Sequence, residues 1–265
     1  MTTHYSELPV EEQEPGRSLE GVNFRTAGTT NKTFPRGRPG KTRSEKMPPH
    51  RLRPDATGPW TPDRRSWGIL RFFAAAAGGE VVCRHSLAVA RQALILARAL
   101  AVQEGGFFRD LEAGALLHDI GKIGIPRRIL MKCGALSPFE LRIVREHPLV
   151  GFELISRLEF LRGAGGVVLY HHERYDGRGY PFGLARDSIP LVARVFSLAD
   201  AMDAMTSNRP YRGGRSVLEA RAEIVRCRGT QFDPDVVDAF LRVPLAVWRE
   251  AGQRLRPAEA AFRVN

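Results

Sequence analysis

EVVCRHSLAVARQALILARALAV, residues 80–102, is the stretch that decides the fold class. It places apolar side chains at spacings of three, four and seven residues, at Val82, Val89, Ala93, Leu96 and Leu100. Such a period marks one face of an α-helix, and the stretch predicts an amphipathic helix of roughly six turns. We therefore expect a chain that is built on helices.

Shorter stretches carry the signals that begin and end helices. SPFE (137–140) and SVLE (216–219) both have the Ser-x-x-Glu form of a capping box. Asp233 followed by Pro234 is expected to open another helix, and residues 111–120 run into Gly121, which suits the left-handed conformation that closes a helix. Strand alternation and two-residue hairpin turns are lacking. The predicted fold class is therefore all-α, a helical bundle with loops around residues 171–190.

The composition is that of a globular chain with a basic charge balance. Of 265 residues, 43% are hydrophobic and 26% are charged, which fits neither a fully disordered nor a fibrous protein. Half of the 18 prolines lie before residue 67, among Arg, Gly, Thr and Glu. We expect a disordered basic tail over residues 1–74, a helical domain over 75–245 and a C-terminal extension over 246–265. The tail is interpreted as a solvated linker, with contact to nucleic acid or protein as the alternative.

Charge and cysteine content restrict the partners and the compartment. The net charge of +11 favours anionic partners such as nucleotides, nucleic acid or a membrane surface, without choosing among them. The cysteines are Cys83, Cys133 and Cys227, an odd number without CxxC spacing, which predicts neither a disulfide framework nor a thiolate metal site. An apolar run of membrane-spanning length and an apolar signal region are also absent. We expect a cytoplasmic protein without a membrane partner.

Histidines and carboxylates form the pattern that points to chemistry. Five imidazoles and two carboxylates occur in separate segments of the expected bundle, at His85, His118, Asp119, His147, His171, His172 and Asp200. Neutral imidazole with carboxylate suits iron, manganese or zinc, and facing helices of a bundle can bring such ligands to two metals. Each residue alone has a simpler explanation, because a single histidine on an apolar helix face is more often a core side chain. Together they favour a metal site, since those explanations would have to hold several times over.

Four segments carry a resemblance to a known family. They are LLHDIGKIGIP (116–126), HP (147–148), HHERYDGRGYP (171–181) and ADAMDAMTSNRPYR (199–212). In order and spacing they resemble the HD-GYP family of bacterial cyclic di-GMP phosphodiesterases, over about residues 80–243. The resemblance implies that the chain hydrolyses cyclic di-GMP to pGpG, and it leaves open whether hydrolysis continues to GMP. It does not favour nucleic acid as a partner.

The resemblance also implies roles for individual residues. The metal ligands are expected to be His85, His118, Asp119, His147, His171, His172 and Asp200. Asp119 takes the place of the carboxylate that bridges two divalent ions, iron or manganese, which together activate water and hold a phosphate oxygen. Lys122 matches the lysine that meets the scissile phosphate, and Arg209 and Arg212 match cationic positions that contact phosphates.

The GYP loop itself consists of Gly179, Tyr180 and Pro181. In the family this loop is linked to substrate access and to the docking of partner proteins such as diguanylate cyclases, and both uses remain open here. One departure concerns the metals: Val81 stands where some members have a glutamate for a third ion, so two metals are expected.

Two other functions are compatible with the pattern. The first is hydrolysis of another cyclic dinucleotide or of a nucleotide, because the metals would act on a phosphate that all of these share. The second is a non-catalytic scaffold that docks signalling proteins through the GYP loop. All seven expected ligands are kept, which favours an enzyme over a scaffold.

Overall fold

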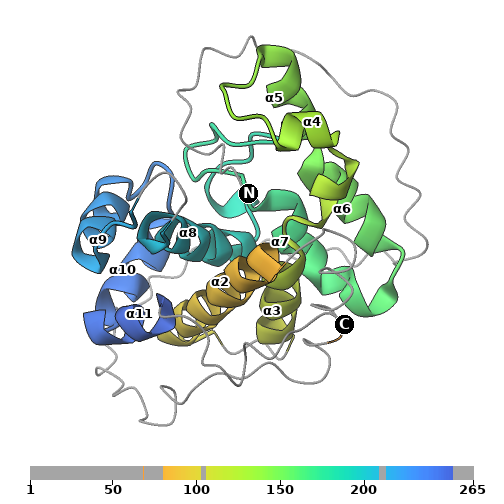
Figure 1. Cartoon of the computed structure of the whole chain (residues 1–265). Coiled ribbons are helices and arrows are strands. Elements are labelled where there is room, and N and C mark those ends of the chain that lie inside the picture. Colours follow the sequence, from red (N-terminus) through yellow and green to blue (C-terminus); the bar gives the residue numbers. More distant parts are fainter. Residues whose placement is uncertain (1–67, 69–79, 103–105, 209–212, 253–265) are drawn as a thin grey trace. The chain divides into compact units, whose positions relative to one another are not determined.

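The computed structural model describes residues 68, 80–102, 106–208 and 213–252. Within these ranges the chain is helical, and extended pairing is limited to two isolated bridges, so the expected all-α class is confirmed (Figure 1). Apart from Gly68, the predicted basic tail lies outside the described residues, as do Arg209 and Arg212. None of the described helices is both long and apolar enough to cross a membrane.

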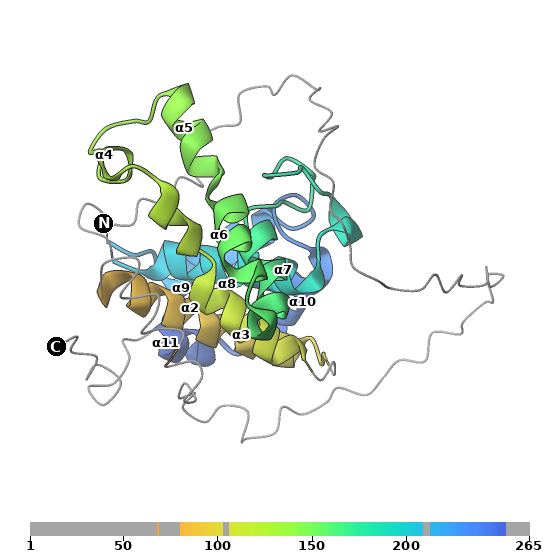
Figure 2. The same ribbon diagram turned by 90° about the vertical axis from the view of Figure 1, so that its right-hand side faces the viewer.

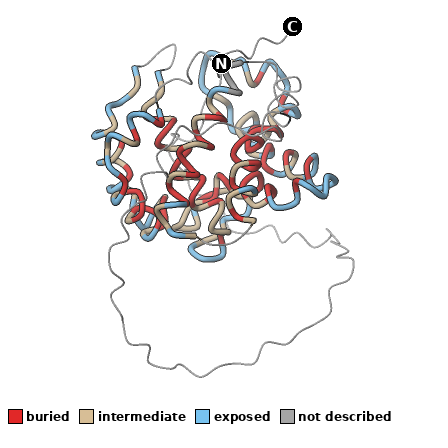
Figure 3. The backbone as a smooth tube through the Cα atoms, turned by 90° about the horizontal axis from the view of Figure 1, so that it is seen from below, coloured by how far each residue is buried: buried red, intermediate tan, exposed pale blue. Residues whose placement is uncertain are grey.

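Three helices form the centre of the bundle. Helix α2 (Glu80–Ala99) packs against α3 (Phe107–Leu117) and α8 (Leu191–Thr206). Val89, Ala93 and Leu96 of the apolar face expected on α2 are fully buried, and buried residues gather in the interior of the described part (Figure 3). The helix ends three residues before Val102, because Ala101 adopts a left-handed φ of 55° and turns the chain away. His85 lies on α2, Asp200 lies on α8 and His118 directly follows α3, so the packing of these helices brings the three side chains to one place.

The segment after α3 differs from the sequence expectation. Helix α3 ends at Leu117, a 3₁₀ turn occupies Ile120–Gly124, and Gly121 does not have the left-handed conformation that we expected. Gly121 is needed for a different reason. A Cβ atom there would lie 1.9 Å from the carbonyl oxygen of His147 and 2.5 Å from the nitrogen of Gly151. The missing side chain lets the backbone of helix α6 (His147–Ser156) approach the 3₁₀ turn.

The remaining helices surround this centre. They are α4 (Arg127–Leu130), α5 (Pro138–Arg145), α7 (Gly165–Tyr170), α9 (Val217–Arg226), α10 (Pro234–Arg242) and α11 (Leu245–Gly252). The capping boxes expected before α5 and α9 are both present, and Asp233 caps α10 by accepting from the nitrogen of Asp235. Helices α4 and α5 lie at the opposite end of the described part from α10 and α11 (Figures 1 and 2) and form a small core of their own.

The main core continues past residue 245, the expected end of the helical domain. The Trp248 side chain on α11 is 2% exposed, and its ring centroid lies 4.8 Å from that of Phe240 on α10. Both side chains belong to the cluster formed by α2 and α8. Helix α11 is therefore part of the bundle rather than an appendage to it.

Candidate metal centre

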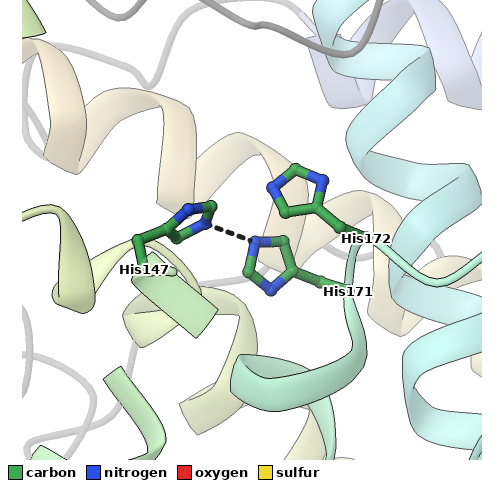
Figure 4. A group of neighbouring side chains, drawn as sticks. All are labelled: His147, His171 and His172. Carbon is green, nitrogen blue, oxygen red and sulfur yellow. Dashed lines mark hydrogen bonds between the residues drawn. The ribbon is translucent and has the colours of Figure 1, made fainter. Parts of the chain in front are cut away.

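The structure brings the expected metal ligands together in two groups. His85 lies on α2, His118 directly follows α3, His147 begins α6, His171 and His172 follow α7, and Asp200 lies on α8. One group, the His85 group, consists of His85, His118 and Asp200. The other, the His147 group, consists of His147, His171 and His172 (Figure 4). Within each group the candidate ligand atoms all lie within 4.8 Å of one another.

Three of the imidazoles are held in the same way by the backbone. His118, His147 and His171 each have Nδ1 at 2.7 to 3.0 Å from the carbonyl oxygen three residues earlier. A carbonyl oxygen only accepts, so Nδ1 carries a proton in each ring, and in a neutral ring Nε2 then keeps its lone pair. The helix ends thus present three Nε2 atoms to the interior as possible metal ligands.

The His147 group fits a cation. The Nε2 atoms of His147 and His171 lie 3.1 Å apart, although both carry lone pairs (Figure 4). Burial lowers the pKa of His147 to about 4 and holds the pKa values of His171 and His172 well below their ordinary range, so the rings are neutral near pH 7. Two lone pairs at this distance repel unless a cation lies between them. Neutral imidazoles whose lone pairs converge are suitable ligands for a transition metal.

The His85 group has the opposite charge character. Nε2 of His85 lies 3.2 Å from Asp200 Oδ1, and Nδ1 lies 2.8 Å from Asp203 Oδ2. Burial by itself would lower the pKa of His85, but the hydrogen bonds and charges of the two carboxylates raise it to about 10. In the absence of metal the ring is therefore an imidazolium between two carboxylates. A cation held by His85 and Asp200 would replace the proton at Nε2.

Asp119 lies between the two groups. Its Oδ1 is 3.5 Å from His147 Nε2, and its Oδ2 is 3.2 Å from His118 Nε2. Oδ2 also accepts a 2.7 Å hydrogen bond from Lys122 Nζ. Burial would raise the pKa of Asp119, but the charge of Lys122 holds it well below its usual range. Asp119 is thus an anion with one oxygen directed at each ligand group.

The GYP loop lies against the His147 group. The Tyr180 ring stacks on the His172 imidazole with centroids 4.5 Å apart, and the Arg145 guanidinium lies over the same tyrosine at 5.4 Å. Glu173, a buried neighbour of the ligands, accepts from the backbone nitrogens of Phe182 and Leu184 at 2.8 and 3.0 Å. The peptide bond between Tyr180 and Pro181 is cis. The loop is thereby tied to the helix end that carries two candidate ligands.

Sequence reasoning missed two side chains of this site. Asp203 bonds to His85, and its signal was the spacing of three residues from Asp200, which puts both carboxylates on one face of α8. Arg145 lies two residues before His147 on a different helix, and no local pattern indicated its contact with Tyr180. Arg209 and Arg212 lie outside the described residues, so their expected role stays a prediction.

The sequence matches the model of a known domain family over more than half of its length. The family model described as HD domain matches residues 75–236, well over half of the chain. The chain belongs to the HD domain family. A cyclic di-GMP phosphodiesterase of Thermotoga maritima is 44% identical over 139 residues, which cover 52% of this chain and 38% of the relative. A 3'3'-cGAMP-specific phosphodiesterase of Vibrio cholerae is 36% identical over 156 residues, which cover 59% of this chain and 34% of the relative.

A solved HD-domain structure shows the same fold. The HDG"Y"P protein of Bdellovibrio bacteriovorus superposes with a TM-score of 0.50 at 20% identity, over 66% of this chain and 60% of that chain. The matches to the two curated relatives span less than half of each relative. Together with the matched HD domain, these similarities confirm the HD-GYP resemblance that the four segments predicted. HD-domain phosphodiesterases depend on metals, and the described residues of this chain include two groups of side chains able to hold metal ions.

Proposed function

We propose that this chain is a metal-dependent phosphodiesterase that hydrolyses cyclic di-GMP to linear pGpG, and that pGpG is the precursor of any GMP formed. The observation that carries the proposal is the anionic Asp119 between two groups of metal-ligating side chains. The substrate is proposed on the similarity to cyclic di-GMP phosphodiesterases.

Two divalent ions, iron or manganese, are the proposed cofactors. The His85 group would hold one ion, the His147 group would hold the other, and Asp119 would be shared. Bound there, the ions would activate water and stabilise negative charge on the phosphate. A third ion is not proposed, because Val81 offers no ligand atom at the position where some family members have a glutamate.

The protein's own residues supply position and charge. Lys122 is half-buried, and its Nζ already lies beside Asp119, so it can reach a non-bridging oxygen of a phosphate bound there. Hydrolysis forms a bond from a water oxygen to phosphorus and breaks the bond from phosphorus to the ribose 3' oxygen. That oxygen takes up a proton, and pGpG leaves with its phosphate at the 5' end.

The loop and the following arginines are the proposed substrate contacts. Gly179, Tyr180 and Pro181 lie beside the His147 group, and the tyrosine ring stacks on a candidate ligand. Arg209 and Arg212 are assigned to the phosphates on the family resemblance alone. Docking of a diguanylate cyclase or another signalling protein is the alternative use of the loop, whose Phe182 is exposed.

A second candidate substrate is the cyclic dinucleotide 3'3'-cGAMP. The relative from Vibrio cholerae is specific for 3'3'-cGAMP, and the site described here acts on the phosphodiester that both dinucleotides contain. Base recognition would decide between them. We propose cyclic di-GMP because the relatives named for it are more similar to this chain, at 44% against 36% identity.

The test is a metal analysis combined with a turnover assay on one anaerobic preparation. We expect about two iron or manganese ions per chain and release of pGpG from cyclic di-GMP, with a lower kcat/KM for 3'3'-cGAMP. Changing His118→Ala together with Asp119→Ala should abolish turnover and metal binding, with helicity followed by circular dichroism. A folded double variant with the wild-type rate would refute the site. A filled three-ion centre would refute the two-metal assignment.

A further inference from the structure

His85 differs from three of the other histidine candidates in what holds its second ring nitrogen. His118, His147 and His171 use a backbone carbonyl of their own helix end, whereas His85 Nδ1 lies 2.8 Å from the Asp203 carboxylate on another helix. His85 is on α2 and Asp203 is on α8, so the contact links two of the three central helices. A carboxylate behind a ligating imidazole fixes the ring orientation and makes its free nitrogen a stronger ligand.

Asp203 is held in place by a second buried contact. It is 3% exposed, and its Oδ1 accepts from Nε2 of Gln92, which is 1% exposed and lies on α2 two turns after His85. Both carboxylate oxygens are thus engaged, which a buried anion requires. Hydrogen bonds thus connect Gln92 to Asp203 and Asp203 to Nδ1 of His85. The other ring nitrogen of His85, Nε2, is directed at Asp200.

The two ligand groups therefore differ in charge. The His85 group includes the Asp200 carboxylate and has Asp203 behind it, whereas the His147 group consists of three imidazoles. Asp119 directs one oxygen at each group, and the oxygen that faces His118 also accepts from Lys122. A divalent cation is attracted more strongly to the group with the greater negative charge.

We propose that Asp203 is a positioning residue that orients His85 and makes the His85 group the tighter of two unequal metal sites. The first ion to bind fills the His85 group, and the second fills the His147 group. This inference rests on the metal site of the proposed function, but not on the identity of the substrate.

Titration of Mn²⁺ into the whole chain, stripped of metal, tests the proposal by calorimetry. Wild-type protein should bind in two steps of unequal affinity. Asp203→Asn keeps the shape and an acceptor for His85 but removes the charge, and should weaken the tighter step by about 10- to 100-fold while the weaker step stays unchanged. His85→Ala should remove the tighter step and so identify it. Gln92→Met, which removes only the donor to Asp203, should weaken the same step less.

A matched control separates this effect from a general loss of charge. Asp238→Asn removes a carboxylate from an exposed pair with Arg228 and should leave both steps as in wild type. Two equal steps in wild type, no change in Asp203→Asn, or an equal weakening of both steps would overturn the proposal. If Asp203→Asn does not fold, Gln92→Met replaces it in the test, and an unchanged tighter step in that variant would overturn the proposal. Two unequal steps without turnover of cyclic di-GMP would support this inference and refute the proposed substrate.

Discussion

Lys122 Nζ lies 2.7 Å from Asp119 Oδ2, the carboxylate oxygen that also faces His118. In the absence of metal the ammonium group therefore neutralises the carboxylate that the two ligand groups share. A cation beside Asp119 would compete with this ion pair and leave Lys122 available to a bound phosphate. The pair thus links the charge state of the metal centre to the residue proposed to stabilise the reaction.

Lys122→Ala should lower kcat by about 10²- to 10³-fold and leave the metal content unchanged, because the lysine would act on charge that grows in the transition state. Steady-state rates on cyclic di-GMP and metal analysis of the same sample measure both quantities. Lys132→Ala is the control, since it removes a lysine from a partly exposed pair with Glu140. Tighter metal binding with an unchanged kcat would show that Lys122 serves only to neutralise Asp119.

The stability of the metal-free protein should pass through a maximum near pH 6.5. Below that value the histidines of the unfolded chain take up protons. In the folded protein the three rings of the His147 group stay neutral, because the pKa of His147 is about 4 and the pKa values of the other two are also lowered. Stability therefore falls as the pH falls. Above it folded His85, with a pKa of about 10, keeps a proton that the unfolded chain has lost, so stability falls as the pH rises. Each proton that only one of the two states binds changes the free energy of unfolding by up to about 1.4 kcal/mol per pH unit.

Denaturant unfolding of chelator-treated protein between pH 5 and 9 measures this profile. With Mn²⁺ bound, the decline above pH 6.5 should diminish, because a cation replaces the proton on His85. A flat profile in the metal-free protein would contradict the charge assignments of both groups.

Arg209→Ala and Arg212→Ala should raise KM for cyclic di-GMP more than they lower kcat. Arginines that hold a phosphate without taking part in its reaction contribute about equally to the ground state and the transition state. Arg226→Ala is the matched control, because its guanidinium is exposed and paired with Glu223. Unchanged KM values in both variants would place these arginines on the solvated surface.

Local signals in the sequence predicted the individual helices well, but they did not predict which helices contact one another. The apolar period of α2 and the serine caps of α5 and α9 were confirmed, because each depends on residues within a few positions. Gly121 was misinterpreted since its constraint is a carbonyl of His147, 26 residues later. Periodicity alone could not have brought His85 to Asp200, which is 115 residues away, and only the resemblance indicated that they meet. Asp203 shares a face with Asp200, but its bond to His85 depends on how α2 packs on α8.

Gly179 is the loop residue with the least room for a side chain. A Cβ atom there would lie 2.4 Å from the nitrogen of Arg174, 2.5 Å from Cα of Glu173 and 2.6 Å from the carbonyl oxygen of His172. All three are backbone atoms, so the loop itself would have to move in Gly179→Ala. The variant should move the Tyr180 ring from its position on His172, and a displacement of about 1 Å can cost about 10²-fold in rate.

We expect kcat/KM of Gly179→Ala on cyclic di-GMP to fall by at least about 10-fold, with helicity retained. Gly134→Ala is the matched control, because a Cβ at Gly134 would have no described atom within 4 Å. The metal content of the Gly179→Ala protein distinguishes two roles of the loop. A loss of rate with two ions still bound would assign the loop to the substrate, whereas a loss of rate that follows a loss of metal would assign it to holding His172. Wild-type kcat/KM in Gly179→Ala would exclude both roles, since the backbone contact with His172 cannot survive the added methyl group unchanged.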